Sequence, residues 1–357
     1  MKKKRILKIA AIVLATAIFL PLLVILGGRG VYAAKLHIRG GVQERIFVTL
    51  GGIEQQIHIR GENAGNPVIV WLHGGPGWSD AYELAPWQYK MENDYTFIRW
   101  DQRGSGRTYY RSPGAPLSLD IMVSDVDELV DYAVERFGQP VYIVGDSWGS
   151  QLGITYASRH PEKIAGFVRV GQHLDKAESE RIAIETACER AIAAGNTEDA
   201  AEMRAVYERI RNKSVLGADF NFDDYVLIQQ LPARYLAPRY ESQGFGVIFS
   251  PWFGFSEIKE LMTIFMFNNN LLFDRNRPLF HEVETFVPPG RLDVQAAFIQ
   301  GSEDYICNTS LVAEYCGRLE APSKEMFIIE GAGHSPYSPQ PEAFAEKLSE
   351  ALAGFHR

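Results

Sequence analysis

A serine able to act as a nucleophile lies in the stretch Gly145-Asp146-Ser147-Trp148-Gly149. The stretch follows the buried β-rich run Val141–Val144, precedes the helical pattern of Gln151–Arg159, and matches the Gly-x-Ser-x-Gly pattern of a strand-to-helix turn. Small residues two positions before and after the serine let such a turn close without collision. The helix that begins there directs free N–H groups toward a developing negative charge. We therefore predict that Ser147 is a nucleophile.

A serine hydroxyl needs a base, and the base needs an acid that orients it. In chains with this kind of turn, the order along the sequence is Ser, then Asp or Glu, then His. One later β-rich run ends in Gly301-Ser302-Glu303-Asp304, and the next ends in Gly331-Ala332-Gly333-His334. Both segments follow the carboxyl end of an expected strand, where an open α/β sheet places its ligands. We predict His334 as the base and Asp304 as the acid, with Glu303 as the competing carboxylate.

The loop His73-Gly74-Gly75-Pro76-Gly77 is suited to holding the negative charge that forms on a carbonyl oxygen. It follows the apolar run Val68–Leu72, and its glycines let backbone N–H groups approach a substrate closely. One such donor typically contributes about 10²–10³ in rate. We predict an oxyanion hole made by the N–H groups of Gly75 and Trp148, and a structural role for His73.

The aspartate beside the serine is an alternative nucleophile. A turn centred on Asp146 would place Val144 and Trp148 at the two positions that need small residues. Side chains of that size would prevent a tight turn, so Ser147 is the better prediction.

The elements that must position these residues follow from the hydrophobic pattern. Apolar β-branched runs alternate with helical patterns, for example the helical spacing from Ser118 to Phe137, which ends at Gly138. Two earlier runs, Arg45–Leu50 and Ile53–Arg60, are joined as a hairpin. This alternation predicts a mostly parallel, doubly wound sheet. Together with the nucleophile turn, it predicts the α/β-hydrolase fold.

One long interval breaks this alternation. Helix-forming sequence (Ala177–Ala194 and Thr197–Lys213) is followed there by sequence rich in Phe and Tyr. We interpret residues 174–289 as a helical cap, inserted into a core that consists of residues 40–173 and 290–357.

The amino terminus is predicted to lie outside this fold. Lys2–Arg5 is basic, and Ile9–Leu26 is an almost wholly apolar run, close to the length that spans a bilayer. Signal-peptide apolar segments are usually shorter, about 7–15 residues. Against an uncleaved anchor stand Pro21 and the acceptable cleavage site Val31-Tyr32-Ala33. We favour an anchor over a cleaved signal within residues 1–33. In both cases the basic flank stays cytoplasmic, which places the body outside the cytoplasm.

Charge and cysteine content exclude several classes of function. The net charge is −8, and residues 1–33 carry six basic and no acidic side chains, so the remainder is near −14. Such a body repels phosphate backbones, so we expect no nucleic-acid partner. Cys188, Cys307 and Cys316 lack zinc-ligand spacing. We expect no metal and no cofactor, and we favour unlinked cysteines over a Cys307–Cys316 bridge.

The motifs HGGPG (73–77), DQRGSGR (101–107), GDSWGS (145–150) and GAGH (331–334) resemble those of the proline iminopeptidase (prolyl aminopeptidase) family. The resemblance covers about residues 65–175 and 293–350. It implies the same fold, the same triad and oxyanion residues, and action on small peptides. Asp146 departs from the family, which usually has Gly there, and so does the stretch after DQRGSGR.

Enzymes of that family hold the substrate ammonium with cap carboxylates, but the cap of this chain does not match theirs. Four glutamates are candidates by composition only, and each is better explained as a solvated charge on a helix: Glu178, Glu180, Glu185 and Glu241.

The sequence as a whole therefore predicts a serine hydrolase that forms an acyl-enzyme on amide or ester bonds. An aminopeptidase acting on small peptides is the first expectation. A carboxylesterase or lipase-like enzyme for apolar esters is the alternative, and a catalytically silent binding protein is the second alternative.

Overall fold

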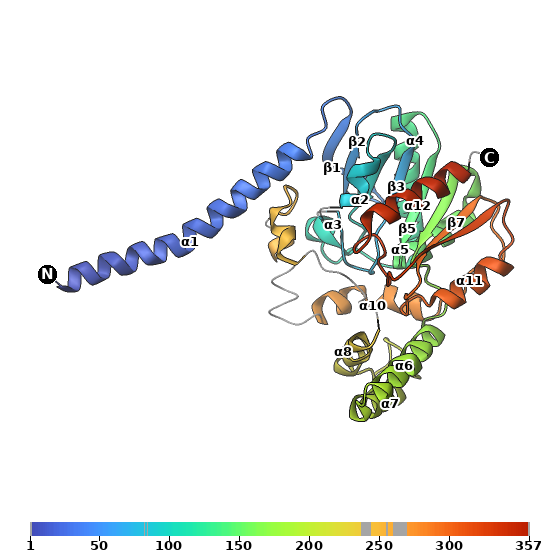
Figure 1. Cartoon of the computed structure of the whole chain (residues 1–357). Coiled ribbons are helices and arrows are strands. Elements are labelled where there is room, and N and C mark those ends of the chain that lie inside the picture. Colours follow the sequence, from blue (N-terminus) through green and yellow to red (C-terminus); the bar gives the residue numbers. More distant parts are fainter. Residues whose placement is uncertain are drawn as a thin grey trace.

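The computed structural model describes residues 2–81, 83, 85–236, 244–254, 256–259 and 270–355. Within these residues, an eight-stranded sheet runs in the order β1-β2-β4-β3-β5-β6-β7-β8 (Figure 1). β1 is antiparallel to β2 and β2 to β4, whereas all the other neighbours are parallel. The strands are β1 (Val42–Leu50), β2 (Ile53–Gly61), β3 (Val68–Leu72), β4 (Thr96–Trp100), β5 (Val141–Asp146), β6 (Ile164–Val170), β7 (Ala296–Gly301) and β8 (Lys324–Ile329). The predicted mostly parallel sheet is confirmed.

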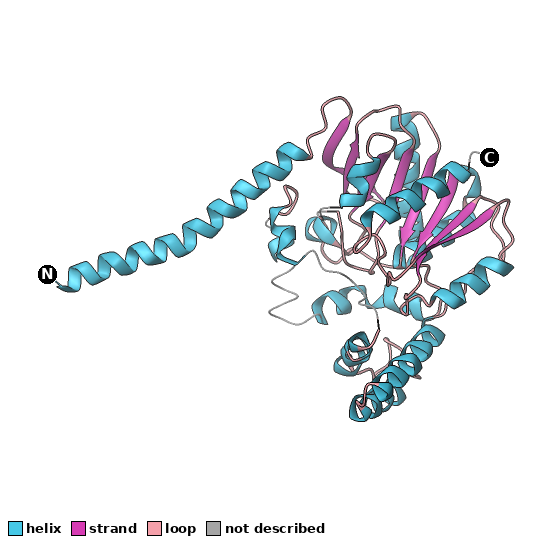
Figure 2. Ribbon diagram, in the orientation of Figure 1, coloured by secondary structure: helices cyan, strands magenta, loops and turns pink. Residues whose placement is uncertain are grey.

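The helices of the described chain include some that cover both faces of the sheet and others that lie away from it (Figure 2). They are α1 (Lys2–Lys35), α2 (Pro86–Met91), α3 (Gly106–Arg111), α4 (Leu119–Phe137), α5 (Trp148–Arg159), α6 (Lys176–Ala193), α7 (Thr197–Ile210), α8 (Phe222–Gln230), α10 (Asn270–Glu284), α11 (Thr309–Arg318) and α12 (Pro341–Gly354), with 3₁₀ turns η1 (Pro161–Lys163), η2 (Pro232–Arg234) and η3 (Gly244–Phe249). In β3, Val68 and Val70 pack with α4, α5 and α11, whereas Ile69 and Trp71 pack with α2 and α12. A strand buried on both faces explains the unbroken apolar runs of the sequence.

The helix predicted from Ser118 to Phe137 is α4. The Ser118 hydroxyl accepts a hydrogen bond from the N–H of Ile121, which caps the first turn. Gly138 ends the helix with φ +69°, a left-handed conformation that glycine adopts without steric cost. Both ends of the helix are therefore fixed by residues visible in the sequence.

In the part of the chain that is described, every element between β6 and β7 is helical. Figure 1 shows α6, α7 and α8 projecting together at the bottom of the view. They share a small apolar core of their own that includes Ala187, Met203 and Ile228. The division of the chain into a core and a cap at residues 173/174 and 289/290 stays a prediction.

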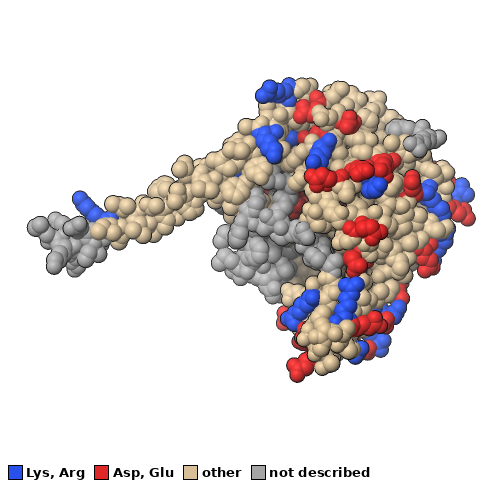
Figure 3. Space-filling model, in the orientation of Figure 1, with Lys and Arg blue, Asp and Glu red and all other residues tan. Residues whose placement is uncertain are grey.

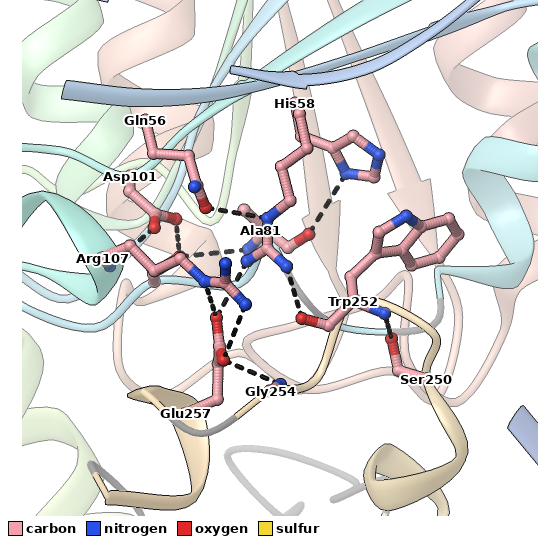
Figure 4. Close-up of polar contacts among 11 residues, drawn as sticks. Gln56, His58, Ala81, Asp101, Arg107, Ser250, Trp252, Gly254 and Glu257 are labelled. Atoms are coloured by element: carbon pink, nitrogen blue, oxygen red, sulfur yellow. Dashed lines mark hydrogen bonds and ion pairs between the residues drawn. The ribbon is translucent and has the colours of Figure 1, made fainter. Parts of the chain in front are cut away.

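A second segment of the cap lies against the core near β1. We call residues 250–254 and 256–257 the latch segment. The buried Glu257 carboxylate accepts hydrogen bonds from Arg45 Nη2 of β1 at 2.8 Å and from Arg107 Nε of α3 at 2.7 Å (Figure 4). Arg45 Nη1 also donates to the carbonyl oxygen of Trp252. The latch segment is thus attached to the core by buried charges, not by apolar packing alone.

Helix α1 is long and apolar enough to cross a membrane, with a mean hydropathy of 3.0 over its best 18-residue window in Lys8–Lys35. It extends away from the body, and most of its visible surface is uncharged (Figures 1 and 3). A signal sequence has the same properties, so an anchor and a signal both remain compatible with this helix. At its carboxyl end, Arg29 Nε donates to the Ile248 carbonyl oxygen at 2.8 Å, and Tyr32 packs against Trp252 and Phe253.

Candidate active site

The three residues predicted for the triad lie together at the carboxyl ends of β5, β7 and β8. Ser147 Oγ is 2.9 Å from His334 Nε2, and His334 Nδ1 is 3.0 Å from Asp304 Oδ2. All three side chains are buried, with relative exposures of 6 %, 1 % and 2 %. A continuous hydrogen-bonded chain from hydroxyl to imidazole to carboxylate is the arrangement by which an imidazole can remove a serine proton.

The carboxylate that contacts His334 belongs to Asp304, not to its neighbour Glu303. Asp304 Oδ1 accepts hydrogen bonds from the backbone N–H groups of Ile306 and Cys307, each at 2.9 Å. Glu303 instead pairs with Arg190 at 3.1 Å and is partly exposed. The two N–H donors fix the orientation of the carboxylate, so Asp304 is suited to hold one tautomer of His334.

Ser147 occupies a strained turn between β5 and α5. It has φ +50° and ψ −115°, and it is the one non-glycine residue with positive φ in the described chain. A Cβ on Gly145 would lie 2.3 Å from the Gly149 carbonyl oxygen, and a Cβ on Gly149 would lie 2.0 Å from the Leu72 carbonyl oxygen. Neither position accepts a side chain, which is the steric reason for the Gly-x-Ser-x-Gly spacing.

Gly75 and Trp148, the predicted oxyanion residues, line the same pocket as Ser147 and His334. Trp148 is in the first turn of α5, where the helix supplies no acceptor for its N–H. The sequence analysis missed Gln102, which is buried between these two elements. Its Oε1 accepts from Trp148 Nε1 at 3.0 Å, and its Nε2 donates to the His73 carbonyl oxygen at 3.0 Å. Gln102 therefore joins the glycine loop to the nucleophile turn.

The chain is similar to several known proteins. The profile of the family described as "Serine aminopeptidase, S33" matches residues 64–196. A probable aminopeptidase, YbaC, of Bacillus subtilis is 24% identical over 308 residues, which cover 85% of this chain and 94% of that protein. A proline iminopeptidase of Arabidopsis thaliana is 35% identical over 115 residues, 31% of this chain and 28% of the plant protein. The solved proline iminopeptidase of Mycobacterium smegmatis superposes with a TM-score of 0.53 at 18% identity, covering 87% of this chain and 98% of that one.

The chain is a hydrolase of the α/β-hydrolase fold that resembles the proline iminopeptidases. The fold expected from the sequence is confirmed. The aligned segment spans less than a third of the plant proline iminopeptidase, so the activity of that relative comes to this hydrolase only as a proposal.

The DQRGSGR segment of the hydrolase holds loops together. Arg103 Nε donates to Asp125 Oδ2 of α4 at 2.8 Å, and both side chains are buried. The backbone N–H of Arg107 donates to Asp101 Oδ2 at 2.8 Å, while the Arg107 side chain binds Glu257 of the latch segment. The two arginines thus have a structural role, and neither is among the residues that line the pocket.

The pocket of the hydrolase lies between the nucleophile turn and the helices of the cap. Its apolar wall is contributed mainly by α6, α8 and α10, and it includes Ala183, Ile184, Ile228, Leu236, Phe280 and Val283. Of the glutamates considered for a substrate ammonium that lie in the described residues, Glu180 is the one that lines this pocket. Glu178 and Glu185 bind Arg181 on the outer face of α6, and Glu241 lies outside the described residues.

Glu180 is not alone in the pocket. Its Oε1 is 2.6 Å from Nζ of Lys176, which lies one helical turn earlier in α6 and also lines the pocket. Burial lowers the pKa of Lys176, but the Glu180 carboxylate and the Tyr225 hydroxyl outweigh it, and the net pKa is raised. Lys176 therefore stays charged at neutral pH. No motif marked this lysine in the sequence.

Asp146, which departs from the proline iminopeptidase pattern, is buried behind the nucleophile turn. Its Oδ2 accepts a hydrogen bond from Tyr337 Oη at 3.0 Å. Burial raises the pKa of this carboxyl to about 7, His334 opposes the rise, and Asp80 adds to it. A Cβ on Gly74 would lie 2.9 Å from Asp146 Oδ2 and 3.3 Å from Ser147 Cβ, so the aspartate side chain packs against the glycine loop beside the nucleophile turn.

The cysteines of the hydrolase are unlinked. Asp304, Cys307 and His334 have potential ligand atoms within 4.8 Å of one another, close enough for a metal ion. Asp304 and His334 are already hydrogen-bonded to each other at 3.0 Å. A metal ion bound by both would replace that hydrogen bond, so this cluster fits a triad better than a metal site.

Proposed function

We propose that the chain is a serine hydrolase that cleaves amide or ester bonds through an acyl-enzyme. In the first step, His334 takes the Ser147 proton as Oγ bonds to the substrate carbonyl carbon. His334 then gives this proton to the leaving amine or alcohol as the scissile bond breaks. Water attacks the acyl-serine next, and His334 takes a proton from it. The acyl–Oγ bond then breaks, the carboxylic acid leaves, and His334 returns the proton to Ser147 Oγ. Asp304 holds the imidazole and stabilises its cation.

The N–H groups of Gly75 and Trp148 stabilise the oxyanion in both steps. The mechanism needs neither metal nor cofactor. One observation carries the proposal: the unbroken contacts Ser147 Oγ–His334 Nε2–Asp304 Oδ2 at the mouth of a lined pocket.

Two substrate classes are candidates. Sequence similarity to a probable aminopeptidase and to proline iminopeptidases supports an aminopeptidase acting on small peptides. The apolar wall of the pocket supports instead a carboxylesterase or lipase-like enzyme acting on small apolar esters. A catalytically silent binding protein is the remaining alternative, and an ordered triad disfavours it.

A fluorophosphonate probe tests the site, because it labels an activated serine covalently. We expect labelling of the wild-type protein and none of Ser147→Ala. Labelling that survives the substitution would refute the assignment of the nucleophile, and an unlabelled wild-type protein would favour the silent binding protein. Hydrolysis of proline p-nitroanilide is then compared with that of p-nitrophenyl butyrate, and turnover of the ester alone would argue against the aminopeptidase.

A further inference from the structure

The charges in the pocket bear on which substrates it accepts. Glu180 and Glu303 are the carboxylates among the described residues that line it. Each is paired with a cation of the protein itself: Glu180 with Lys176 at 2.6 Å, and Glu303 with Arg190 at 3.1 Å. Each negative charge on the described pocket wall is therefore already paired with a positive side chain of the same protein.

A substrate ammonium needs a counter-charge when it leaves water, because an unpaired buried charge is unfavourable. Glu180 is the best placed carboxylate for this task, since it lies on the pocket wall next to the apolar side chains of α6. Its Oε1 atom, however, already accepts from Lys176 Nζ and, at 3.4 Å, from Gln229 Nε2. An incoming substrate ammonium would therefore meet the Lys176 ammonium beside the Glu180 carboxylate, and like charges at short range repel.

The lysine is held in this position from more than one side. Its side chain is about one-fifth exposed, and its ammonium group lies 5.6 Å from the centre of the Tyr225 ring of α8. Lys176 thus lies between a carboxylate of its own helix and an aromatic ring of another. Both contacts favour a cation at this place whether or not substrate is bound.

We propose that Lys176 occupies, from within the chain, the place that a substrate ammonium would take on Glu180. The hydrolase then acts on esters or amides of uncharged, apolar acids and discriminates against acyl groups that carry a free α-amino group. The remaining pocket wall is complementary to such an acyl group because it is built from Ala183, Ile184, Ile228 and Phe280. This inference rests on the proposed acyl-enzyme function and names its substrate class.

The test is a pair of acyl groups that differ only in the amine. Leucine and 4-methylpentanoate have the same carbon skeleton, and each is offered as its p-nitroanilide and as its methyl ester at pH 6, where the leucine amine is protonated. For the wild-type protein we expect kcat/KM to be at least about tenfold higher for the 4-methylpentanoyl compounds, the factor that corresponds to one lost charge-assisted hydrogen bond. Equal or faster turnover of the leucyl compounds would overturn the inference.

Lys176→Met keeps the length of the side chain and exposes the Glu180 carboxylate. We expect this variant to shift the ratio of kcat/KM by at least about tenfold toward the leucyl compound, mainly through a lower KM. Lys176→Met/Glu180→Gln should lose that shift. Lys347→Met removes the same charge from an exposed pair with Glu350 on α12 and should leave the ratio unchanged. A ratio unaffected by Lys176→Met would contradict the role given to this lysine.

Failure of this inference is distinguishable from failure of the proposed function. Fluorophosphonate labelling of Ser147 with the wrong acyl preference, or with turnover of neither acyl class, would overturn the substrate inference and leave the serine nucleophile standing. Absence of both labelling and turnover would refute the two together.

Discussion

At the scale of single residues, the candidate site combines strain with support. Ser147 has a backbone conformation that costs an L-residue about 1–3 kcal/mol. The cost is accepted because the turn directs Oγ toward His334 while the N–H of Ser147 still bonds to the Val170 carbonyl oxygen at 2.9 Å. Asp304 is held by backbone donors in the same way. The reactive groups are therefore positioned by main chain, which tolerates few alternatives.

Asp304→Asn tests the assignment of the acid. Asparagine keeps the shape but favours the wrong imidazole tautomer, so we expect kcat to fall by about 10⁴. Glu303→Gln is the matched control and should change kcat by less than about fivefold, because Glu303 binds Arg190 rather than His334. Steady-state hydrolysis of whichever chromogenic substrate is turned over measures both. Similar losses in the two variants would contradict the choice of Asp304.

Asp146→Asn tests the buried carboxyl beside the nucleophile. Burial raises its pKa from 3.8 to about 7 in the folded chain, with Glu83, Asp80, Asp304, Tyr337 and His334 as the charged or titratable neighbours. Between about pH 4 and pH 7, Asp146 keeps its proton in the folded state and loses it in the unfolded chain. The contribution of Asp146 to the free energy of unfolding is therefore fully present below about pH 4 and is lost as pH rises toward 7. Asparagine cannot ionise, so its stability relative to wild type should increase between pH 5 and pH 8.

The difference in the free energy of unfolding between Asp146→Asn and the wild type should grow by up to about 1.4 kcal/mol for each unit by which folding raises the pKa of Asp146. Thermal melting at several pH values measures it, as a growing difference in Tm of at least about 3 °C. Asp120→Asn, which removes an exposed partner of Arg159, should show no such trend. A difference in Tm that stays constant with pH would mean that Asp146 is already ionised in the folded protein at pH 5.

The site residues differ in how far the sequence could identify them. Ser147, Asp304 and His334 were identifiable because each stands at a fixed place after an apolar run. Gln102 and Lys176 were not. Their roles depend on contacts with Trp148 and Glu180 that only the packing of the elements determines. A pattern of types and spacings predicts chemistry within one loop, but not which side chains from different elements meet.

At the scale of elements, the latch segment links three parts of the molecule. Glu257 joins Arg45 of β1 to Arg107 of α3 (Figure 4). Trp252 lies against the Arg60 guanidinium, 4.9 Å from ring centre to Cζ. The sequence located many helices well: the expected Ala177–Ala194 and Thr197–Lys213 are α6 and α7 within a few residues. It did not locate the latch segment, because a lone glutamate in an aromatic stretch gives no periodic signal.

Glu257→Gln tests the latch segment. The substitution takes the buried carboxylate away from the partly buried Arg45 and Arg107, so we expect a loss of about 1.5–3 kcal/mol in the free energy of unfolding. Glu54→Gln breaks a solvent-exposed pair with Arg111 and should leave the urea midpoint close to that of the wild type. Urea unfolding followed by circular dichroism measures both. If both variants lost equally little stability, the ion pairs of Glu257 would not be what attaches the latch segment to the core.

At the scale of the whole molecule, α1 is a long apolar helix attached to an acidic body. Its exposed apolar side chains, such as Ile12 and Leu23, have no partners in the body. Figure 3 shows the charged residues gathered on the body instead. A bilayer would cover these side chains, and the basic residues before them favour a cytoplasmic amino terminus.

We therefore expect the chain to fractionate with membranes and its body to be digested by protease added to intact bacterial cells. A variant lacking residues 1–33 should be recovered in the soluble fraction. Protection of residues 40–357 in intact cells, together with digestion after lysis, would reverse the proposed orientation. Wild-type protein in the soluble fraction, shortened at Ala33, would identify the segment as a cleaved signal.

The carboxyl end of α1 is also a structural partner of the body. A cut after Ala33 would take away Arg29 and Tyr32, and with them the donor to the Ile248 carbonyl oxygen and one wall of the Trp252–Phe253 cluster. Shed and tethered forms of the protein would then differ in how firmly the latch segment is held as well as in their location. Cleavage after Ala33 would then alter the body of the protein as well as release it. Kinetic constants measured on a protein that lacks residues 1–33 would therefore differ from those of the full-length protein.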